Sequence, residues 1–244
     1  MTDISTIAVV GYKSCSEQDT ITPLEIFKGA AMVLAGQINP WPLVTPKRDL
    51  SVKLVNLDDG EITMQMGTKV IPDATLGDND LYDMLYVPGG VGSGAMTKDK
   101  RMTDLIRRHH SQGKVVAANC SGVGILHRAG ILDGQPVTCV AAVARGMRAE
   151  GTTVPNPRHM WLGLPDSNLW TTTGSYGVNG STVAMVSHYF GREVGTAVAM
   201  MFDTMGGLGE AIFSPAGPEY FYRPDLEPQF QDFFEPMLLP KDRQ

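Results

Sequence analysis

The chain is poor in charged residues, in basic charge and in cysteine. Charged side chains make up 19% of its 244 residues and hydrophobic ones 43%, the opposite of the balance that keeps a chain disordered. The net charge of −6 argues against a nucleic-acid or anionic-membrane surface, because both require clustered Lys and Arg. No apolar run approaches the roughly 18 to 20 residues that span a bilayer.

The N-terminus also lacks the basic patch and apolar segment of a signal peptide, so we expect a cytoplasmic protein. Its three cysteines, Cys15, Cys120 and Cys139, are an odd number in a reducing compartment, which argues against a disulfide framework. No two of the five histidines have the spacing of a zinc site.

Strands and helices are expected to alternate along most of the chain. Apolar runs predict strands at 5–12, 51–55, 82–87, 114–119, 135–140 and 168–173, with a small hairpin at 62–66 and 69–71. Helical spacing predicts a helix capped by Thr22 with Pro23 in its first turn, and helices at 102–112, 122–129 and 181–205, the last broken near Gly191 or Gly195.

This alternation predicts an α/β fold, a doubly wound and mostly parallel sheet with helices on both faces. No repeat or linker is evident, so 1–244 is interpreted as one domain. Its core is expected at about 5–205 and includes a Pro-rich loop at 37–49. The extension at 206–244 is rich in Pro, Phe and Tyr, and we expect it to wrap the domain or a partner subunit.

The strongest local signal for chemistry is the strand that ends at Cys120. Ser121 and Gly122 follow at once and begin a helix, which predicts a nucleophile elbow at the carboxyl edge of the sheet. The helix N-terminus is expected to lower the pKa of the thiol. A buried structural cysteine is the competing interpretation, because free cysteine is among the most buried residue types.

A second signal is the Pro88-Gly89-Gly90 turn at the end of the 82–87 strand. The Gly90 N–H, together with that of Ser121, is expected to form an anion site at the same sheet edge. The run 90–95 also matches the dinucleotide fingerprint. However, no acidic residue closes the next strand, so this match is a weak argument for a nucleotide.

Asp19 gives a third signal, since it lies between the first strand and the first helix. A carboxyl there could exchange a proton with a thiol or a substrate atom, although a turn residue is the simpler interpretation of Asp19 alone. Residues 19, 90 and 120 each follow a different strand, and a parallel sheet brings such positions together.

These segments resemble the ThiJ/PfpI superfamily of class I glutamine amidotransferase-like proteins. The resemblance is carried by QDTITPLE at 18–25, YVPGG at 86–90, ANCSG at 118–122, AGILDG at 129–134 and TGSYG at 173–177. It implies a flavodoxin-like sandwich that forms a homodimer. It also implies Cys120 as nucleophile, Asp19 as the acid that touches its sulfur, Ser121 beside them, and an anion or substrate site at Gly89, Gly90, Ser121 and Tyr176.

The Asp-then-Cys pairing, with a hydroxyl residue after the cysteine, is most similar to the isonitrile hydratase branch. This resemblance implies a lyase: the thiolate attacks the terminal carbon of an isonitrile, Asp19 relays the proton, and water releases an N-formamide. Neither a metal nor an organic cofactor is implied, and the partner is a small-molecule substrate.

The chain also departs from that pattern. Protease-like members place a histidine where this chain has Cys139, which argues against peptidase activity. Asn119, Tyr176 and the 37–49 insertion leave the substrate open, so two alternatives stay: a glyoxalase-like or biosynthetic condensation enzyme acting on a carbonyl compound, and a cysteine redox sensor without enzymatic activity. Cys15 is expected to be an exposed loop residue, with a resolving partner for Cys120 as the alternative. His127 is expected at the surface.

Overall fold

The computed structural model describes residues 3–38, 47–77, 79–203, 209–220 and 227–241. Within these residues the main sheet has seven strands. In spatial order they are β5 (Ala74–Thr75), β2 (Ser51–Asn56), β1 (Thr6–Gly11), β6 (Met84–Val87), β7 (Val115–Asn119), β10 (Leu169–Thr172) and β9 (Trp161–Leu164). All neighbours pair in parallel except β10 and β9, which are antiparallel. This confirms the α/β fold with a mostly parallel sheet.

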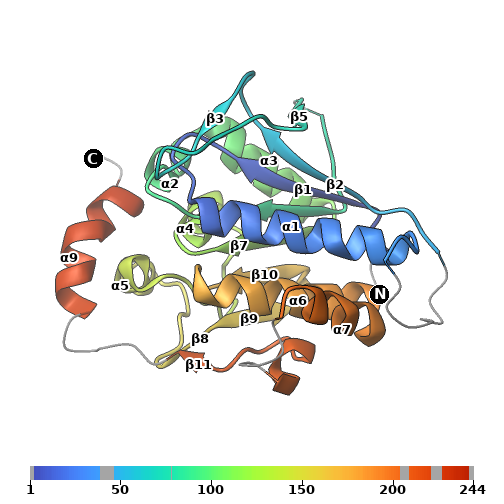
Figure 1. Cartoon of the computed structure of the whole chain (residues 1–244). Helices are drawn as coiled ribbons and strands as arrows, with labels where there is room; N and C mark the ends of the chain where they lie inside the picture. The colour runs from blue at the N-terminus through green and yellow to red at the C-terminus, as the bar shows by residue number, and fades with distance from the viewer. Residues whose placement is uncertain (1–2, 39–46, 78, 204–208, 221–226, 242–244) are drawn as a thin grey trace.

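Helices cover both faces of the sheet (Figure 1). The described helices are α1 (Glu17–Leu34), α2 (Ser93–Met96), α3 (Lys100–Ser111), α4 (Gly122–Ala129), α5 (Ala141–Ala149), α6 (Tyr176–Phe190), α7 (Arg192–Met201) and α9 (Glu227–Leu238), with 3-10 turns η1 (Pro165–Ser167) and η2 (Gly209–Phe213). Helices α1, α6 and α7 pack on one another over one face, and α3 and α4 pack together over β6 and β7. None of the described helices is both long and apolar enough to cross a membrane.

Strands β1, β6 and β7 are apolar except for Thr6 and Asn119 at their ends, because helices cover these strands on both sides. Strands β6 and β7 are buried at every residue, and β1 is buried from its second residue onward. The chain makes β2 on one side of β1 and then crosses to form β6 on the other side. In such sheets ligands bind at the carboxyl ends of the strands, near the point where the strand order reverses.

Two short pairings complete the described fold. Strands β3 (Ile62–Thr63) and β4 (Lys69–Val70) form the expected hairpin, and β8 (Arg158–His159) pairs with β11 (Glu219–Tyr220) from the C-terminal extension. Helix α9 of the extension packs along α5. The described parts of the extension therefore lie against the rest of the chain. Most of the expected loop at 37–49 lies outside the described residues.

The expected start of the first helix is wrong by six residues. Helix α1 begins at Glu17, and Ser16 caps it by accepting a hydrogen bond from the Asp19 N–H (3.3 Å). Pro23 therefore lies inside the helix, and Asp19 lies in its first turn. The break of the long helix is at Gly191, whose φ of 99° ends α6 before α7 begins. Helix α6 also starts earlier than expected.

The expected strand at 135–140 is also wrong. The segment has one isolated bridge, between Pro136 and Thr153, and does not join a sheet. The two backbone amides after Pro136 do not bond a neighbouring strand of the sheet in a ladder. The Val137 N–H donates to the Thr153 carbonyl, and the Thr138 N–H donates to the Thr171 hydroxyl. Because side-chain and loop acceptors take these donors, no ladder forms.

Candidate active site

Cys120 occupies a sharp turn between β7 and α4. Its φ of 53° is in the left-handed region, which non-glycine residues adopt rarely. The Cys120 N–H donates to the Thr172 carbonyl (2.9 Å), which holds this turn against β10. The backbones of Gly89 and Gly174 flank the side chain so closely that a Cβ at either position would lie 2.5 Å from the Cys120 Cβ. The expected elbow is therefore present.

Ser121 binds the loop after β6. Its hydroxyl accepts from the Gly90 N–H and donates to the Gly90 carbonyl, both at 3.0 Å, and its own N–H lies in hydrogen-bond contact with the Cys120 sulfur. The Gly89 N–H donates to Asn119 Oδ1 (2.8 Å). An anion at this place would therefore share the Gly90 N–H with the Ser121 hydroxyl.

Asp19 lies beside the cysteine, as expected, although it comes from a helix and not from a loop. Its side chain is 1% exposed. The carboxyl accepts a hydrogen bond from the Ser175 N–H (2.7 Å) and contacts the thiol of Cys120 through another. The structure thus brings together groups from α1, from the β7–α4 turn and from the segment after β10.

Burial and mutual repulsion set the protonation of this pair. Burial raises the pKa of Asp19, and the hydrogen bond from Ser175 only partly offsets this effect. Burial raises the pKa of the Cys120 thiol well above its usual value, and the neighbouring Asp19 carboxyl raises it further. The expected lowering of the thiol pKa is therefore wrong. The Ser121 N–H acts in that direction, but it is outweighed. The pair holds a proton at neutral pH.

The Cys120 side chain is partly exposed to a cavity of about 180 Å³. Its lining comes from distant parts of the chain: Cys120, Val140, Ala141, Arg158, Thr173, Gly174, Ser175, Tyr176 and Phe230. Tyr176, an expected site residue, stands at the cavity with 64% of its surface exposed. Most of the lining is apolar. The cavity thus fits a small substrate with one reactive end at the sulfur.

Several lining residues were not among the predicted site residues, and Arg158 and Phe230 are two of them. Arg158 is 4% exposed and donates from Nη1 to the Cys139 carbonyl (2.6 Å). Phe230 comes from α9, so the extension contributes to the cavity. The aromatic richness of 206–244 was a signal for Phe230, whereas no local pattern pointed to Arg158.

Three helices begin at the cavity wall or at the cysteine itself. These are α4 after Ser121, α5 after Val140 and α6 after Ser175, and none of these three positions makes a side-chain cap. Helix N-termini favour negative charge through their free N–H groups and dipoles. Together with the Arg158 cation, they act against the burial and the Asp19 charge that disfavour negative charge on the sulfur.

Cys15, Cys139 and His127 do not line the cavity at Cys120. Cys15 is buried, so its expected exposure is wrong. Cys139 is also buried, and burial raises its pKa to about 12. His127 is half-buried, with its side chain 12% exposed, and it bonds to Glu150 (2.8 Å) and Thr152 (2.8 Å). Among the described residues, no three His, Cys, Asp or Glu side chains cluster closely enough to hold a metal ion.

The glycines of the 90–95 run have a packing role. A Cβ at Gly92 would lie 2.1 Å from the Lys13 carbonyl oxygen, and one at Gly94 would lie 1.8 Å from that of Met237. The helix that follows, α2, has only four residues. Close backbone approach therefore accounts for these glycines without a nucleotide.

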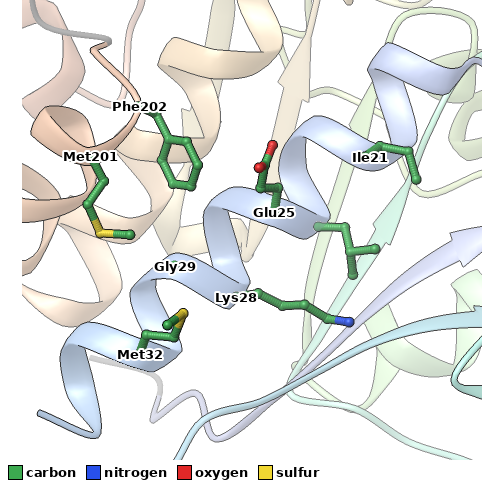
Figure 2. Close-up of a pocket in the computed structure, with 8 residues that line it drawn as sticks. Ile21, Glu25, Lys28, Gly29, Met32, Met201 and Phe202 are labelled. Atoms are coloured by element: carbon green, nitrogen blue, oxygen red, sulfur yellow. The ribbon is translucent and has the colours of Figure 1, made fainter. Parts of the chain in front are cut away.

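A larger cavity, of about 500 Å³, lies between α1 and α7, away from Cys120 (Figure 2). It is mostly apolar and is lined by Ile21, Leu24, Glu25, Lys28, Gly29, Met32, Met201 and Phe202. Gly29 lets the Phe202 ring approach α1, since a Cβ there would lie 2.9 Å from the ring. No cysteine lines this cavity, so the smaller cavity is the candidate site.

Comparisons with known proteins agree with this geometry. Residues 5–176 match the DJ-1/PfpI family. The isonitrile hydratase of Pseudomonas putida is 32% identical over 99 residues, which are 41% of this chain and 43% of that protein. A glutathione-independent glyoxalase of Caenorhabditis elegans, DJR-1.2, is 29% identical over 87 residues, 35% of this chain and 46% of that protein. The chain thus spans less than half the length of either relative.

Among solved structures, a ThiJ/PfpI family protein from Pseudomonas syringae superimposes with a TM-score of 0.72. The match covers 98% of this chain and 90% of the other at 18% sequence identity. At that identity the match establishes the shared fold alone.

Proposed function

The chain belongs to the DJ-1/PfpI family, and from this premise we propose that it is a cysteine enzyme that hydrates a small isonitrile to an N-formamide. The observation that carries this proposal is the buried Asp19 carboxyl in hydrogen-bond contact with the thiol of Cys120 at the wall of a small cavity. Such a pair can supply a nucleophile and a proton at the same place.

In the first step the sulfur of Cys120 forms a bond to the terminal carbon of the isonitrile. The thiol proton passes to Asp19 and from Asp19 to that same carbon. The product is a thioimidate, Cys–S–CH=N–R, which contains all atoms of both reactants. The raised pKa of Asp19 suits this relay, because it makes the carboxylate a stronger base toward the thiol proton that it takes up and passes on.

In the second step water adds to the thioimidate carbon. The carbon–sulfur bond then breaks, a proton returns to the sulfur, and R–NH–CHO leaves as the formamide. The Ser121 N–H, the N-termini of α4, α5 and α6 and the Arg158 cation stabilise the sulfur as its charge rises. No oxidant or reductant is needed in either step.

The cavity limits the substrate. Its volume of about 180 Å³ and its Val140, Ala141, Tyr176 and Phe230 walls favour a compact alkyl or aryl group on the isonitrile nitrogen. The test is to incubate the protein with tert-butyl isonitrile and to follow the formyl proton of the product by NMR. Formamide production by the wild-type protein and none by Cys120→Ala is the expected result. Formamide formation at the same rate by the variant would refute the proposal.

Carbonyl chemistry is the second candidate. After the sulfur adds to the aldehyde carbon of a 2-oxoaldehyde, the same Asp19 and Cys120 could move a proton between its adjacent carbons to give a thioester, and the raised pKa of Asp19 favours this as well. Water then breaks the carbon–sulfur bond, so that the 2-hydroxy acid leaves and the thiol is restored. Incubation with methylglyoxal and an assay for lactate separates the two activities. Lactate without formamide would favour this reaction over isonitrile hydration.

A further inference from the structure

Asn119 lies directly before Cys120 at the end of β7 and is fully buried. Its side-chain Nδ2 donates to the Asp19 carbonyl (2.8 Å) and to the Tyr86 hydroxyl (3.0 Å). Its Oδ1 accepts from the Gly89 N–H (2.8 Å). One side chain therefore joins α1, β6 and the loop after β6 to the strand that carries the cysteine.

The Asp19 carbonyl depends on this bond because of Pro23. In an α-helix the N–H of each residue bonds the carbonyl four positions earlier, so residue 23 would serve residue 19. Proline has no N–H, and a buried carbonyl without a partner is costly. Asn119 supplies the missing donor from outside the helix. The proline of α1 and the asparagine of β7 thus act as a pair.

We propose that Asn119 is a positioning residue that fixes the first turn of α1 against the elbow, so that the Asp19 carboxyl stays on the Cys120 sulfur. The inference rests on the proposed pairing of Asp19 with Cys120. Two other contacts hold the same turn: the Ser16 N–H donates to the Gly89 carbonyl (2.9 Å), and the Asp19 carboxyl accepts from Ser175. The hydrogen bond from Asn119 to the Asp19 backbone carbonyl replaces the bond that the helix lacks.

The pH dependence of thiol alkylation reports this geometry. The titratable groups near Cys120 are Asp19 from α1, Tyr12 after β1 and Tyr86 from β6, with Arg158 and Tyr176 at the cavity. Burial raises the pKa of Tyr12 and of Tyr86, so these two stay neutral near pH 7. Of these neighbours, Asp19 is the one whose negative charge raises the pKa of the thiol, and that effect weakens if Asp19 moves away.

The experiment measures alkylation of Cys120 by iodoacetamide from pH 6 to pH 11, with peptide mass spectrometry to separate the three cysteines. The Asn119→Ala variant is expected to shift the profile to lower pH by roughly 1 unit. Pro23→Ala restores a backbone N–H to the Asp19 carbonyl. The double variant Pro23→Ala/Asn119→Ala is therefore expected to recover at least half of that shift.

Controls separate positioning from general loss of structure. Tyr86→Phe removes another partner of Asn119 without touching Asp19, and its profile is expected to match the wild type. In an Asp19→Asn background, Asn119→Ala is expected to cause no further shift, because the charge that it positions is gone. Circular dichroism and thermal melting verify folding, and Asn119→Ser, which keeps one hydroxyl for hydrogen bonding, replaces the alanine variant if that one does not fold.

An unchanged pH profile of alkylation in the folded Asn119→Ala variant would overturn the inference. An equal shift of the profile in Asn119→Ala and in the double variant Pro23→Ala/Asn119→Ala would overturn it as well. Alkylation requires no isonitrile, so this result is independent of the proposed hydration. The expected shift without formamide production would refute the hydration alone. Formamide production with an unchanged profile would refute the role of Asn119 alone.

If both proposals hold, Asn119→Ala lowers kcat about tenfold, equal to about 1.4 kcal/mol, with little change in KM.

Discussion

Cys120 and Cys139 occur in the same local setting but in different environments. Each lies one residue before the N-cap of a helix, which is Ser121 of α4 for Cys120 and Val140 of α5 for Cys139. Burial raises the pKa of both thiols. Cys120, however, has a left-handed backbone, a carboxyl partner and a cavity. Cys139 is fully buried, and its carbonyl accepts from Arg158.

The difference teaches that a position just before the N-cap of a helix does not by itself make a reactive cysteine. The positive φ turns the Cys120 side chain away from the course of the strand, and the close glycine backbones at 89 and 174 leave room for it. Asp19 and the cavity then give the sulfur a proton acceptor and access to substrate. Cys139 has neither of these features, so we interpret it as a core residue.

The sharpest test of this comparison removes each sulfur in turn. Cys120→Ala is expected to abolish formamide production, a fall of at least about 10³-fold, because the nucleophile is gone. Cys139→Ala is the matched control and is expected to retain kcat within about twofold of the wild type. Initial rates measured by NMR at saturating isonitrile check both. A similar loss in both variants would mean that the two cysteines do not differ as described.

Asp19 is the second point of difference between the two cysteines. Asp19→Asn keeps the size of the side chain but removes the proton relay, so kcat is expected to fall about 10²-fold to 10⁴-fold. Glu17→Gln, in the same turn of α1, is the control, since that exposed carboxylate accepts from the Met66 and Thr68 amides and does not face the cavity. Steady-state kinetics on both variants provide the measurement. Equal kcat values for Asp19→Asn and the wild type would remove Asp19 from the mechanism.

Phe230 tests the role of the cavity that Cys120 has and Cys139 lacks. Phe230→Ala widens the cavity, so kcat/KM for a bulky isonitrile is expected to rise about tenfold relative to that for a small one. Helix α9 keeps its other contacts, including Gln231 to the Ala141 carbonyl (3.0 Å) and Asp232 to Arg145 (2.7 Å). Phe233→Ala, at an exposed position of the same helix, is the control. An unchanged preference in Phe230→Ala would place the substrate elsewhere.

The smallest expected effect concerns stability. Because burial raises the folded-state pKa of Asp19 above its unfolded value, folding favours the protonated carboxyl. Its contribution to stability is complete below the unfolded pKa and is lost as pH rises through the folded pKa. Asp19→Asn is therefore expected to raise Tm by a few degrees at pH 7 and to bring little change near pH 3. Thermal melts across this range check the sign, and a lower Tm for the variant at pH 7 would contradict it.

Much of the site could be predicted because its parts are local. The apolar run of β7 followed by Cys120 and small residues indicated the elbow, and the parallel order of strands brought Asp19 to it. The predicted start of the first helix was wrong because Pro23 suits a first turn. The true cap, Ser16, lies seven residues before Pro23. The lowered thiol pKa was wrong because the helix N-terminus is a local feature, whereas burial and the Asp19 charge arise only in the fold.

The remaining features depend on contacts between distant segments. Arg158 and Phe230 reach the cavity from β8 and α9, and no spacing in the sequence relates them to Cys120. The 135–140 segment has the composition of a strand but gives its amides to Thr153 and Thr171. A single domain, a homodimer and a cytoplasmic location stay predictions.

The most direct test of the central claim is to detect the adduct on the cysteine. The protein is mixed with tert-butyl isonitrile, quenched with acid at short times, and analysed by intact and peptide mass spectrometry. We predict an added mass equal to one isonitrile molecule on the peptide that contains Cys120, with none on the peptides that contain Cys15 or Cys139. The adduct should accumulate and then decay as formamide appears. Formamide production with no adduct on Cys120 at any quench time, and equally fast in Cys120→Ala, would contradict the account.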